Sequence, residues 1–198
     1  MNTADSAPNT SDATLNPPSD QPKKVSRYYW EDFPVGSVKT FGATRVTREA
    51  ILAFAQQFDP QPFHLDEQAA KASLFGGLCA SGWHTCAMTM RMMCDEYLLD
   101  SAGLGSPGLD NIRWLKPVFP DDVLSMRHEI LEARPMASKP KVGLTRSSWT
   151  VCNQHGDTVM SMEGWSMFRR RLAASAETSV AGETGETGKA ADSAPPAP

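Results

Sequence analysis

Residues 82–99 constrain the fold of this chain more than any other stretch of its sequence. Tryptophan, alanine, methionine, cysteine, threonine and leucine cover most of the circumference of the helix expected there. Charged residues occur chiefly near its end, at Arg91, Asp95 and Glu96. A helix that is apolar on nearly all sides is one that other elements surround. The rest of the fold is therefore expected to wrap around this helix.

The sequence on either side predicts what wraps around it. Alternation of apolar and polar residues, with turn signals between, predicts five strands over residues 38–44, 109–118, 123–132, 142–153 and 158–169. Before the long helix, Thr47 is placed to cap a helix over residues 48–58, and a shorter helix is expected over residues 66–72. We therefore expect an α+β domain in which an antiparallel, five-stranded, curved sheet wraps around a long central helix.

This domain does not need the whole chain of 198 residues. Residues 1–25 and 173–198 are rich in small and polar residues and almost lack large apolar side chains. Such segments bury too little surface to offset the entropy of ordering, so we expect two disordered tails. Residues 26–172 have the usual size of one domain with one core.

Charge and cysteine usage narrow the class of function. The two tails carry the whole net charge of −4, and the basic and acidic residues between them cancel. The domain therefore lacks the basic stripe that nucleic acid requires, and no apolar run is long enough to span a membrane. Without a secretory signal or CxxC spacing among the four cysteines, we expect a cytoplasmic protein with buried thiols.

The loop over residues 59–64, Asp-Pro-Gln-Pro-Phe-His, is the most informative motif. Its two prolines restrict the backbone between Asp59 and His64, so the loop can hold a carboxylate and an imidazole in a fixed relation at low entropic cost. A base and a partner held in this way can share one water molecule. We therefore predict that Asp59 and His64 form an acid/base pair.

A second motif, Phe-Gly-Gly-Leu-Cys-Ala-Ser-Gly at residues 75–82, opens the apolar helix. The pattern Asp-x-Gln-Pro-x-His-x-Asp followed by Phe-Gly-Gly-x-x-Ala-x-Gly resembles the MaoC-like dehydratases, the hotdog-fold family that includes (R)-specific enoyl-CoA hydratases. The resemblance extends to residues 111–122, where Asn-Ile-Arg-Trp-Leu-Lys-Pro-Val is followed by Pro-Asp-Asp. It implies a hotdog fold, an acyl-CoA or related thioester substrate, no metal or other cofactor, and a homodimer.

The resemblance also assigns roles. It implies that Asp59 and His64 hold and activate the water, and that the N–H of Gly82 polarises the thioester carbonyl. An N–H group at a helix N-terminus stabilises the enolate-like oxygen of a hydration, and a glycine leaves room for the acyl group to approach. Contacts with the substrate are expected from six neighbouring residues: Gln61, Pro62, Phe63, Gly77, Ser81 and Trp83.

Several assignments stay open. Many members of the family have asparagine where this chain has Gln61 and histidine where it has Ser81, which leaves the identity of the acyl group open. Ser81 is better explained as the N-cap of the long helix. Asp66 is better explained as a helix cap than as a catalyst, and His84 as a core or interface residue. The basic residues of the predicted loop 134–141 could meet the phosphates of coenzyme A or a carrier protein's phosphopantetheine, or only face solvent. A hotdog thioesterase and a non-catalytic acyl-binding module are the alternative functions.

Overall fold

A computed structural model describes residues 26–171, and both expected tails lie outside these residues. In chain order the elements are η1 (Trp30–Asp32), β1 (Val38–Arg45), α1 (Arg48–Phe58), α2 (Pro62–Leu65), α3 (Glu67–Ala72), α4 (Gly82–Glu96), η2 (Leu98–Asp100), β2 (Gly103–Trp114), β3 (Val123–Met136), β4 (Lys139–Cys152) and β5 (Thr158–Arg169). Within this range, no helix is long and apolar enough to cross a membrane.

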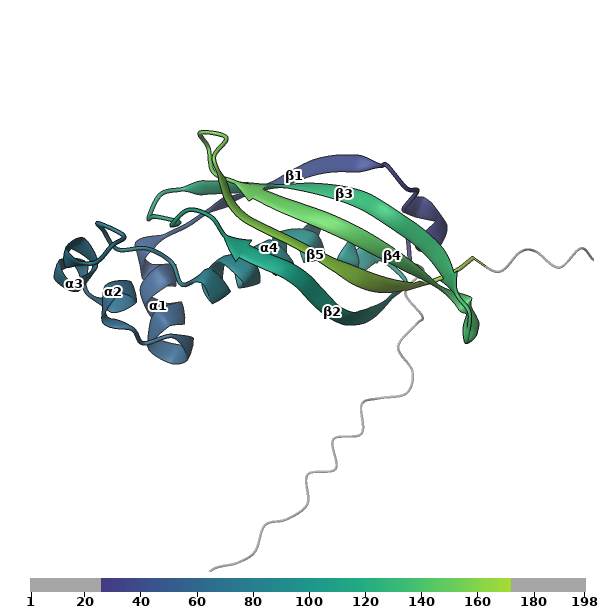
Figure 1. The fold of residues 1–198 in the computed structure, drawn as a ribbon, viewed down its shortest axis with the longest axis horizontal. Coiled ribbons are helices and arrows are strands. Elements are labelled where there is room, and N and C mark those ends of the chain that lie inside the picture. Colours follow the sequence, from purple (N-terminus) through teal and green to yellow (C-terminus); the bar gives the residue numbers. More distant parts are fainter. Residues whose placement is uncertain (1–25, 172–198) are drawn as a thin grey trace, which may run out of the picture.

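The five strands form one antiparallel sheet with the order β1-β3-β4-β5-β2. The sheet curves around α4, while α1, α2 and α3 gather beyond the end of the sheet where α4 begins (Figure 1). Methionines of α4 pack against apolar residues of β3, β4 and β5 to form the core, which includes Met88, Met92, Met93, Leu124, Met126, Val151 and Met160. The expected α+β architecture is confirmed.

The burial of α4 is less complete than its composition suggested. Trp83 is 58% exposed and Met90 is 47% exposed, although both lie on the helix that was expected to be surrounded. The physical reason is that one sheet covers one side of a helix and leaves the other side open. An apolar face of α4 therefore remains uncovered within a single copy of the chain.

Local sequence signals explain how the helices near the site begin. The Thr47 side chain accepts a hydrogen bond from the N–H of Ala50 and caps α1, and the Asp66 side chain accepts one from the N–H of Ala69 and caps α3. Both caps were expected. The segment between these helices was expected to be irregular, but Pro62 starts a single helical turn, α2, since proline is well suited to the first position of a helix.

Three boundaries differ from those expected. The long helix ends at Glu96, because Tyr97 leaves helical geometry and is followed by η2. The second strand covers residues 103–114 instead of 109–118, with register shifts along its pairing with β5. The expected loop 134–141 is mostly strand, because β3 continues to Met136 and β4 begins at Lys139.

Candidate active site

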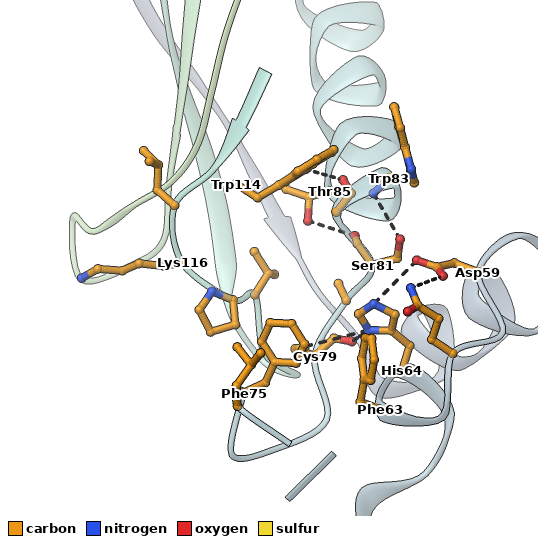
Figure 2. A pocket seen from close by; sticks show the side chains of 17 residues that line it. Asp59, Phe63, His64, Phe75, Cys79, Ser81, Trp83, Thr85, Trp114 and Lys116 are labelled. Carbon is orange, nitrogen blue, oxygen red and sulfur yellow. Dashed lines mark hydrogen bonds and ion pairs between the residues drawn. The ribbon is translucent and has the colours of Figure 1, made fainter. Parts of the chain in front are cut away.

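The end of α1 and the short helix α2 bring Asp59 and His64 together. Asp59 is the residue at which α1 ends, and His64 lies on α2 with only 5% of its surface exposed. The Oδ2 atom of Asp59 lies 3.6 Å from Nε2 of His64, and the Gln61 amide donates a 2.8 Å hydrogen bond to Oδ1 of Asp59. These side chains face one another at the first turn of α4 (Figure 2).

The backbone carbonyl of Cys79 fixes the orientation of the imidazole. Nδ1 of His64 lies 2.8 Å from this oxygen. A carbonyl oxygen can only accept a hydrogen bond, so Nδ1 carries the hydrogen. In the neutral imidazole, Nε2 is therefore an acceptor that faces the Asp59 carboxylate. The rings of Phe63 and Phe75 pack against His64 with centroid distances of 4.6 Å and 6.2 Å.

Ser81 connects the carboxylate to the start of α4. Its side chain is the expected N-cap and accepts a 3.2 Å hydrogen bond from the N–H of Trp83. The Ser81 hydroxyl also donates a hydrogen bond to Asp59, which is the largest single influence on the pKa of this carboxyl group. Burial raises this pKa, but the hydrogen bonds from Ser81 and Gln61, together with the charge that His64 carries when it is protonated, outweigh it, so the pKa of Asp59 lies below its ordinary value.

Gly82 is the first residue of α4, so its N–H has no acceptor within the helix. The room left by its missing side chain is already used, because the indole of Trp114 lies there. A Cβ atom on Gly82 would be 2.5 Å from Cε2 of that indole, and Trp114 Nε1 donates a 2.9 Å hydrogen bond to the Gly82 carbonyl. In this structure the indole lies in that space, and the approach of an acyl group to Gly82 stays a prediction.

These residues line a cavity of about 510 Å³ between the loop, the first turn of α4 and residues 114–118. Seven of the predicted site residues lie on its wall: Asp59, Gln61, Phe63, His64, Ser81, Gly82 and Trp83. Pro62 and Gly77 do not. Pro62 starts α2 with its ring exposed, and Gly77 lies in a separate surface groove beneath the ring of Phe119.

Sequence reasoning missed the wall that follows β2. Trp114, Leu115, Pro117 and Val118 line the cavity together with Phe75. Trp114, Leu115, Pro117 and Val118 come from the end of β2 and the segment after it, which are distant in the sequence from the loop, whereas Phe75 belongs to the second motif. In the sequence, the only signal that pointed to these residues was that the segments containing them resemble the family.

The cysteines and His84 near the site belong to the packed interior of the domain and are not among the proposed catalytic groups. All four cysteines are free, but only Cys79 is fully buried, and burial raises its pKa to about 11, so it stays a thiol. His84 is buried and stacks on Phe54 at 4.8 Å, and burial lowers its pKa. Among residues 26–171, no group of three or more histidine, cysteine, aspartate or glutamate side chains is arranged to hold a metal ion.

The curved sheet, its central helix and the aspartate–histidine loop at the start of that helix define a hotdog-fold protein. Residues 33–151, more than half of the chain, match the family described as MaoC like domain. The chain therefore belongs to this family.

Individual relatives agree with this assignment. A MaoC-like dehydratase from Rhodospirillum rubrum is 40% identical, with a TM-score of 0.68 over 73% of this chain and 99% of that one. The Bacillus subtilis (strain 168) protein YdeM is 31% identical over 105 residues, 53% of this chain and 74% of YdeM. The R-hydratase PhaJ1 from Pseudomonas aeruginosa shares the fold at 22% identity, with a TM-score of 0.59 over 72% of this chain and 86% of that one. The family and these relatives support a hydratase or dehydratase of the hotdog fold.

Proposed function

We propose that this protein catalyses the reversible addition of water to the double bond of a 2-enoyl thioester of the enoyl-CoA type. The observation that carries this proposal is the pairing of Asp59 with His64 in a cavity that also contains the first turn of α4. The proposed catalytic residues are Asp59, His64 and Gly82.

The geometry of the pair suits a shared water molecule. The 3.6 Å separation is too long for a strong direct hydrogen bond, and both Oδ2 of Asp59 and Nε2 of neutral His64 are acceptors. A water between them would donate one hydrogen to each and turn its lone pairs toward the substrate. The lowered pKa of Asp59 keeps this carboxylate ionised at neutral pH.

Each bond change then has a group to support it. Asp59 accepts a proton from the water as the water oxygen forms a bond to Cβ, and the electron pair of the double bond moves toward the thioester oxygen. His64 orients the water, takes this proton from Asp59 at Nε2 and passes it to Cα as the carbonyl is restored, so that both side chains return to their starting states. Each such proton transfer contributes on the order of 10² to 10⁴ in rate.

The negative charge that develops on the thioester oxygen needs a hydrogen-bond donor other than Asp59 and His64. The N–H of Gly82 is unpaired within α4 and points from the positive end of the helix dipole. The indole of Trp114 packs where a side chain on Gly82 would lie, and Gly82 itself lines the cavity. Removing an oxyanion donor of this kind typically costs about 10² to 10³ in rate.

The same proposal includes a homodimer. β2 is an edge strand, and apolar side chains stay exposed along it and on the uncovered side of α4: Trp83, Met90, Leu104, Leu109 and Trp114. A second copy that pairs along β2 would cover both surfaces. Light scattering should therefore report a dimer or higher homo-oligomer, and Leu109→Lys should shift it toward monomer. A wild-type monomer at micromolar concentration would rule this assembly out.

The positions of the acidic residues support a hotdog thioesterase less well than a hydratase. A hotdog thioesterase is expected to use a carboxylate on or near the central helix. The acidic residues of α4 are Asp95 and Glu96, about 20 Å along the helix from Gly82 at 1.5 Å per residue. They form ion pairs with Arg91 and Lys39 instead.

One assay separates the candidates. Purified protein is incubated with a panel of 2-enoyl-CoA substrates, and loss of the conjugated double bond and release of free thiol are followed together. We expect loss of the double bond without thiol release. Thiol release without hydration would establish the thioesterase, and binding without either signal would establish an acyl-binding module. The cytoplasmic location stays a prediction that cell fractionation tests.

A further inference from the structure

One wall of the candidate active site is aromatic and takes no part in the proposed proton transfers. The ring of Phe63 lies 4.6 Å from the centre of the His64 imidazole, and the ring of Phe75 lies 6.2 Å from it. The two phenyl rings also contact each other, with centroids 5.3 Å apart. Figure 2 shows both rings on the side of His64 that faces away from Trp114 and the start of α4.

Contacts along this wall place its groups in a definite order. Gly82 follows Ser81, whose hydroxyl donates a hydrogen bond to the Asp59 carboxylate. Asp59 lies 3.6 Å from His64, and the phenyl rings pack against His64 in turn. The order is therefore the N–H at the start of α4, the carboxylate, the imidazole and the pair of phenyl rings.

A 2-enoyl thioester fits this order in one direction. In the proposed reaction its carbonyl oxygen lies on the Gly82 N–H, and its Cβ lies at the water that Asp59 and His64 hold. The trans double bond is extended, so the carbons after Cβ continue away from Gly82. They pass His64 and lead toward the phenyl rings, while the thioester sulfur lies on the other side of the carbonyl carbon.

The floor of the cavity separates this path from the core of the domain. Among the described residues, no methionine of α4 lines the cavity, and the buried methionines of this helix belong to the core. The floor is formed by Ala80 and Val118, which are both buried, and the Ala80 N–H donates a 2.8 Å hydrogen bond to the Val118 carbonyl. The acyl chain therefore stays between this floor and the phenyl rings.

Phe75 is held at the end of the path by the turn that follows α3. Its N–H donates a 3.2 Å hydrogen bond to the Ser73 hydroxyl oxygen, and this hydroxyl donates one of 2.6 Å to the Ala70 carbonyl. Gly76 continues the turn with a φ of 71°, a value that favours glycine. The neighbouring Leu74 also lines the cavity but is 91% exposed. The Phe75 ring therefore closes a path that would otherwise reach the surface.

The distance between the rings sets the room for the chain. Phe75 lies 6.2 Å from His64, and nonbonded carbon atoms approach to about 3.5–4 Å, so about 2.5 Å remain. An extended hydrocarbon chain advances roughly 1.3 Å per carbon, so this room holds roughly two carbons. Together with the carbonyl carbon, Cα and Cβ, they make an acyl group of about five carbons.

We propose that Phe75 limits the length of the acyl group, and that the substrate is a short-chain 2-enoyl thioester of about four to six carbons. This inference rests on the proposed hydration and names the class of substrate that the reaction takes. Phe75 is a specificity-determining residue, because its ring meets the end of the acyl chain and touches no reacting atom.

The first test is the dependence of kcat/KM on acyl length in 2-butenoyl-, 2-hexenoyl-, 2-octenoyl- and 2-decenoyl-CoA. For the wild type, kcat/KM should fall on the order of 10² from 2-butenoyl-CoA to 2-octenoyl-CoA, since the longer chain overfills a closed pocket. In Phe75→Ala, 2-octenoyl-CoA should gain about tenfold or more, while 2-butenoyl-CoA should change by less than about threefold. Phe75→Leu should lie between. A gain on the longer substrate cannot arise from misfolding.

Phe119→Ala is the matched control for loss of a phenyl ring. Phe119 lies over Gly77 in the separate surface groove, so its removal should leave the dependence on acyl length unchanged. A wild-type kcat/KM that stays level up to 2-decenoyl-CoA would overturn the proposal. The same dependence in Phe75→Ala as in the wild type would overturn it too.

A binding measurement keeps this inference separate from the proposed function. Butyryl-CoA and octanoyl-CoA have no double bond to hydrate, and calorimetry reports their affinities for the wild type and for Phe75→Ala. Octanoyl-CoA should bind on the order of tenfold more tightly to Phe75→Ala, and butyryl-CoA equally to both proteins. These affinities without hydration of any 2-enoyl-CoA would count against the proposed function alone. Equal affinities of the two proteins for octanoyl-CoA would overturn the role of Phe75.

Discussion

Asp59 is held by neighbours from two separated parts of the chain. Gln61 is two residues away and His64 five residues away, whereas Ser81 belongs to the start of α4. Burial opposes ionisation of this carboxyl group, but these three contacts prevail and lower its pKa. The side chain is therefore both ionised and fixed in direction before substrate binds.

The amide of Gln61 can be removed without touching the reacting pair. In Gln61→Leu, Asp59 loses a charge-assisted hydrogen bond, so its pKa rises toward its ordinary value and the ionised form is lost at higher pH. We expect kcat to fall about tenfold and the acid limb of the pH–rate profile to move to higher pH. Gln57→Leu, an exposed glutamine on α1, is the control. An unchanged acid limb in Gln61→Leu would show that this amide does not hold the base.

The sequence predicted those parts of the site that depend on nearby residues. The two prolines indicated that Asp59 and His64 act together, and Ser81 was identified as a cap from its place before the helix. The Cys79 carbonyl and the Trp114 indole could not be predicted in the same way. Their contacts with His64 and Gly82 join residues 15 and 32 positions apart, and only the folded chain brings them together.

At the scale of elements, the junction between α4 and the end of β2 determines the shape of the site. Gly82 allows the Trp114 indole to lie directly against the first turn of α4, and a hydrogen bond from Nε1 holds it there. The exposed ring of Trp83 packs edge-on against Trp114 at 5.4 Å. The helix therefore meets the sheet through a close contact that only glycine permits.

Gly82→Ala tests this junction. The new Cβ would lie 2.5 Å from the indole, so Trp114 must move and lose its hydrogen bond. We expect the free energy of unfolding to fall by about 1–3 kcal/mol and hydration to fall with it. Gly77→Ala is the matched control, because its Cβ would meet Phe119 at an ordinary 3.7 Å. If adding Trp114→Leu to Gly82→Ala gave a fully additive loss of stability, the two residues would not be coupled as described.

Element types were easier to predict than element ends. The caps at Thr47 and Asp66 are local signals, and both helices begin where those signals place them. The β3–β4 hairpin is different, because residues 134–141 look like a loop until the two strands pair. Ladder hydrogen bonds between β3 and β4 override the weak local preference there.

At the scale of the whole molecule, α4 and the sheet enclose a histidine that the proposed reaction does not use. His128 on β3 is 6% exposed and stacks between Tyr97 and Trp149, at 5.3 Å and 5.4 Å. Its Nε2 lies 3.0 Å from the Ser147 hydroxyl. Burial, and secondarily the charge of Lys39, lowers the pKa of His128 to about 4 from an ordinary value of 6.5.

This lowered pKa makes stability depend on pH. The unfolded chain takes up a proton near pH 6.5 and the folded chain only near pH 4, so stability falls as pH drops through this window. We expect a loss of about 2 kcal/mol between pH 7 and pH 4.5, measured by urea denaturation at these two pH values. His128→Gln should flatten the dependence, while His155→Gln, in an exposed turn, should not. The same pH dependence in wild type and His128→Gln would contradict this assignment.

The architecture as a whole was predictable because apolar residues cover most of the circumference of one helix and not a single face. That single property required a sheet around it, and the alternation of the strands supplied one. The uncovered face of α4 and the exposed edge of β2 did not follow from the sequence pattern, since periodicity does not show which apolar residues the same chain will cover.

The central claim, that Asp59 and His64 carry out the hydration, is tested most directly by the rate of 2-enoyl-CoA hydration in three variants. We predict that Asp59→Asn and His64→Asn each lower kcat by about 10² or more, with unchanged circular dichroism. Asp66→Asn should keep nearly full activity, because asparagine also caps α3. Wild-type hydration that persists within a few-fold in both Asp59→Asn and His64→Asn would contradict the account.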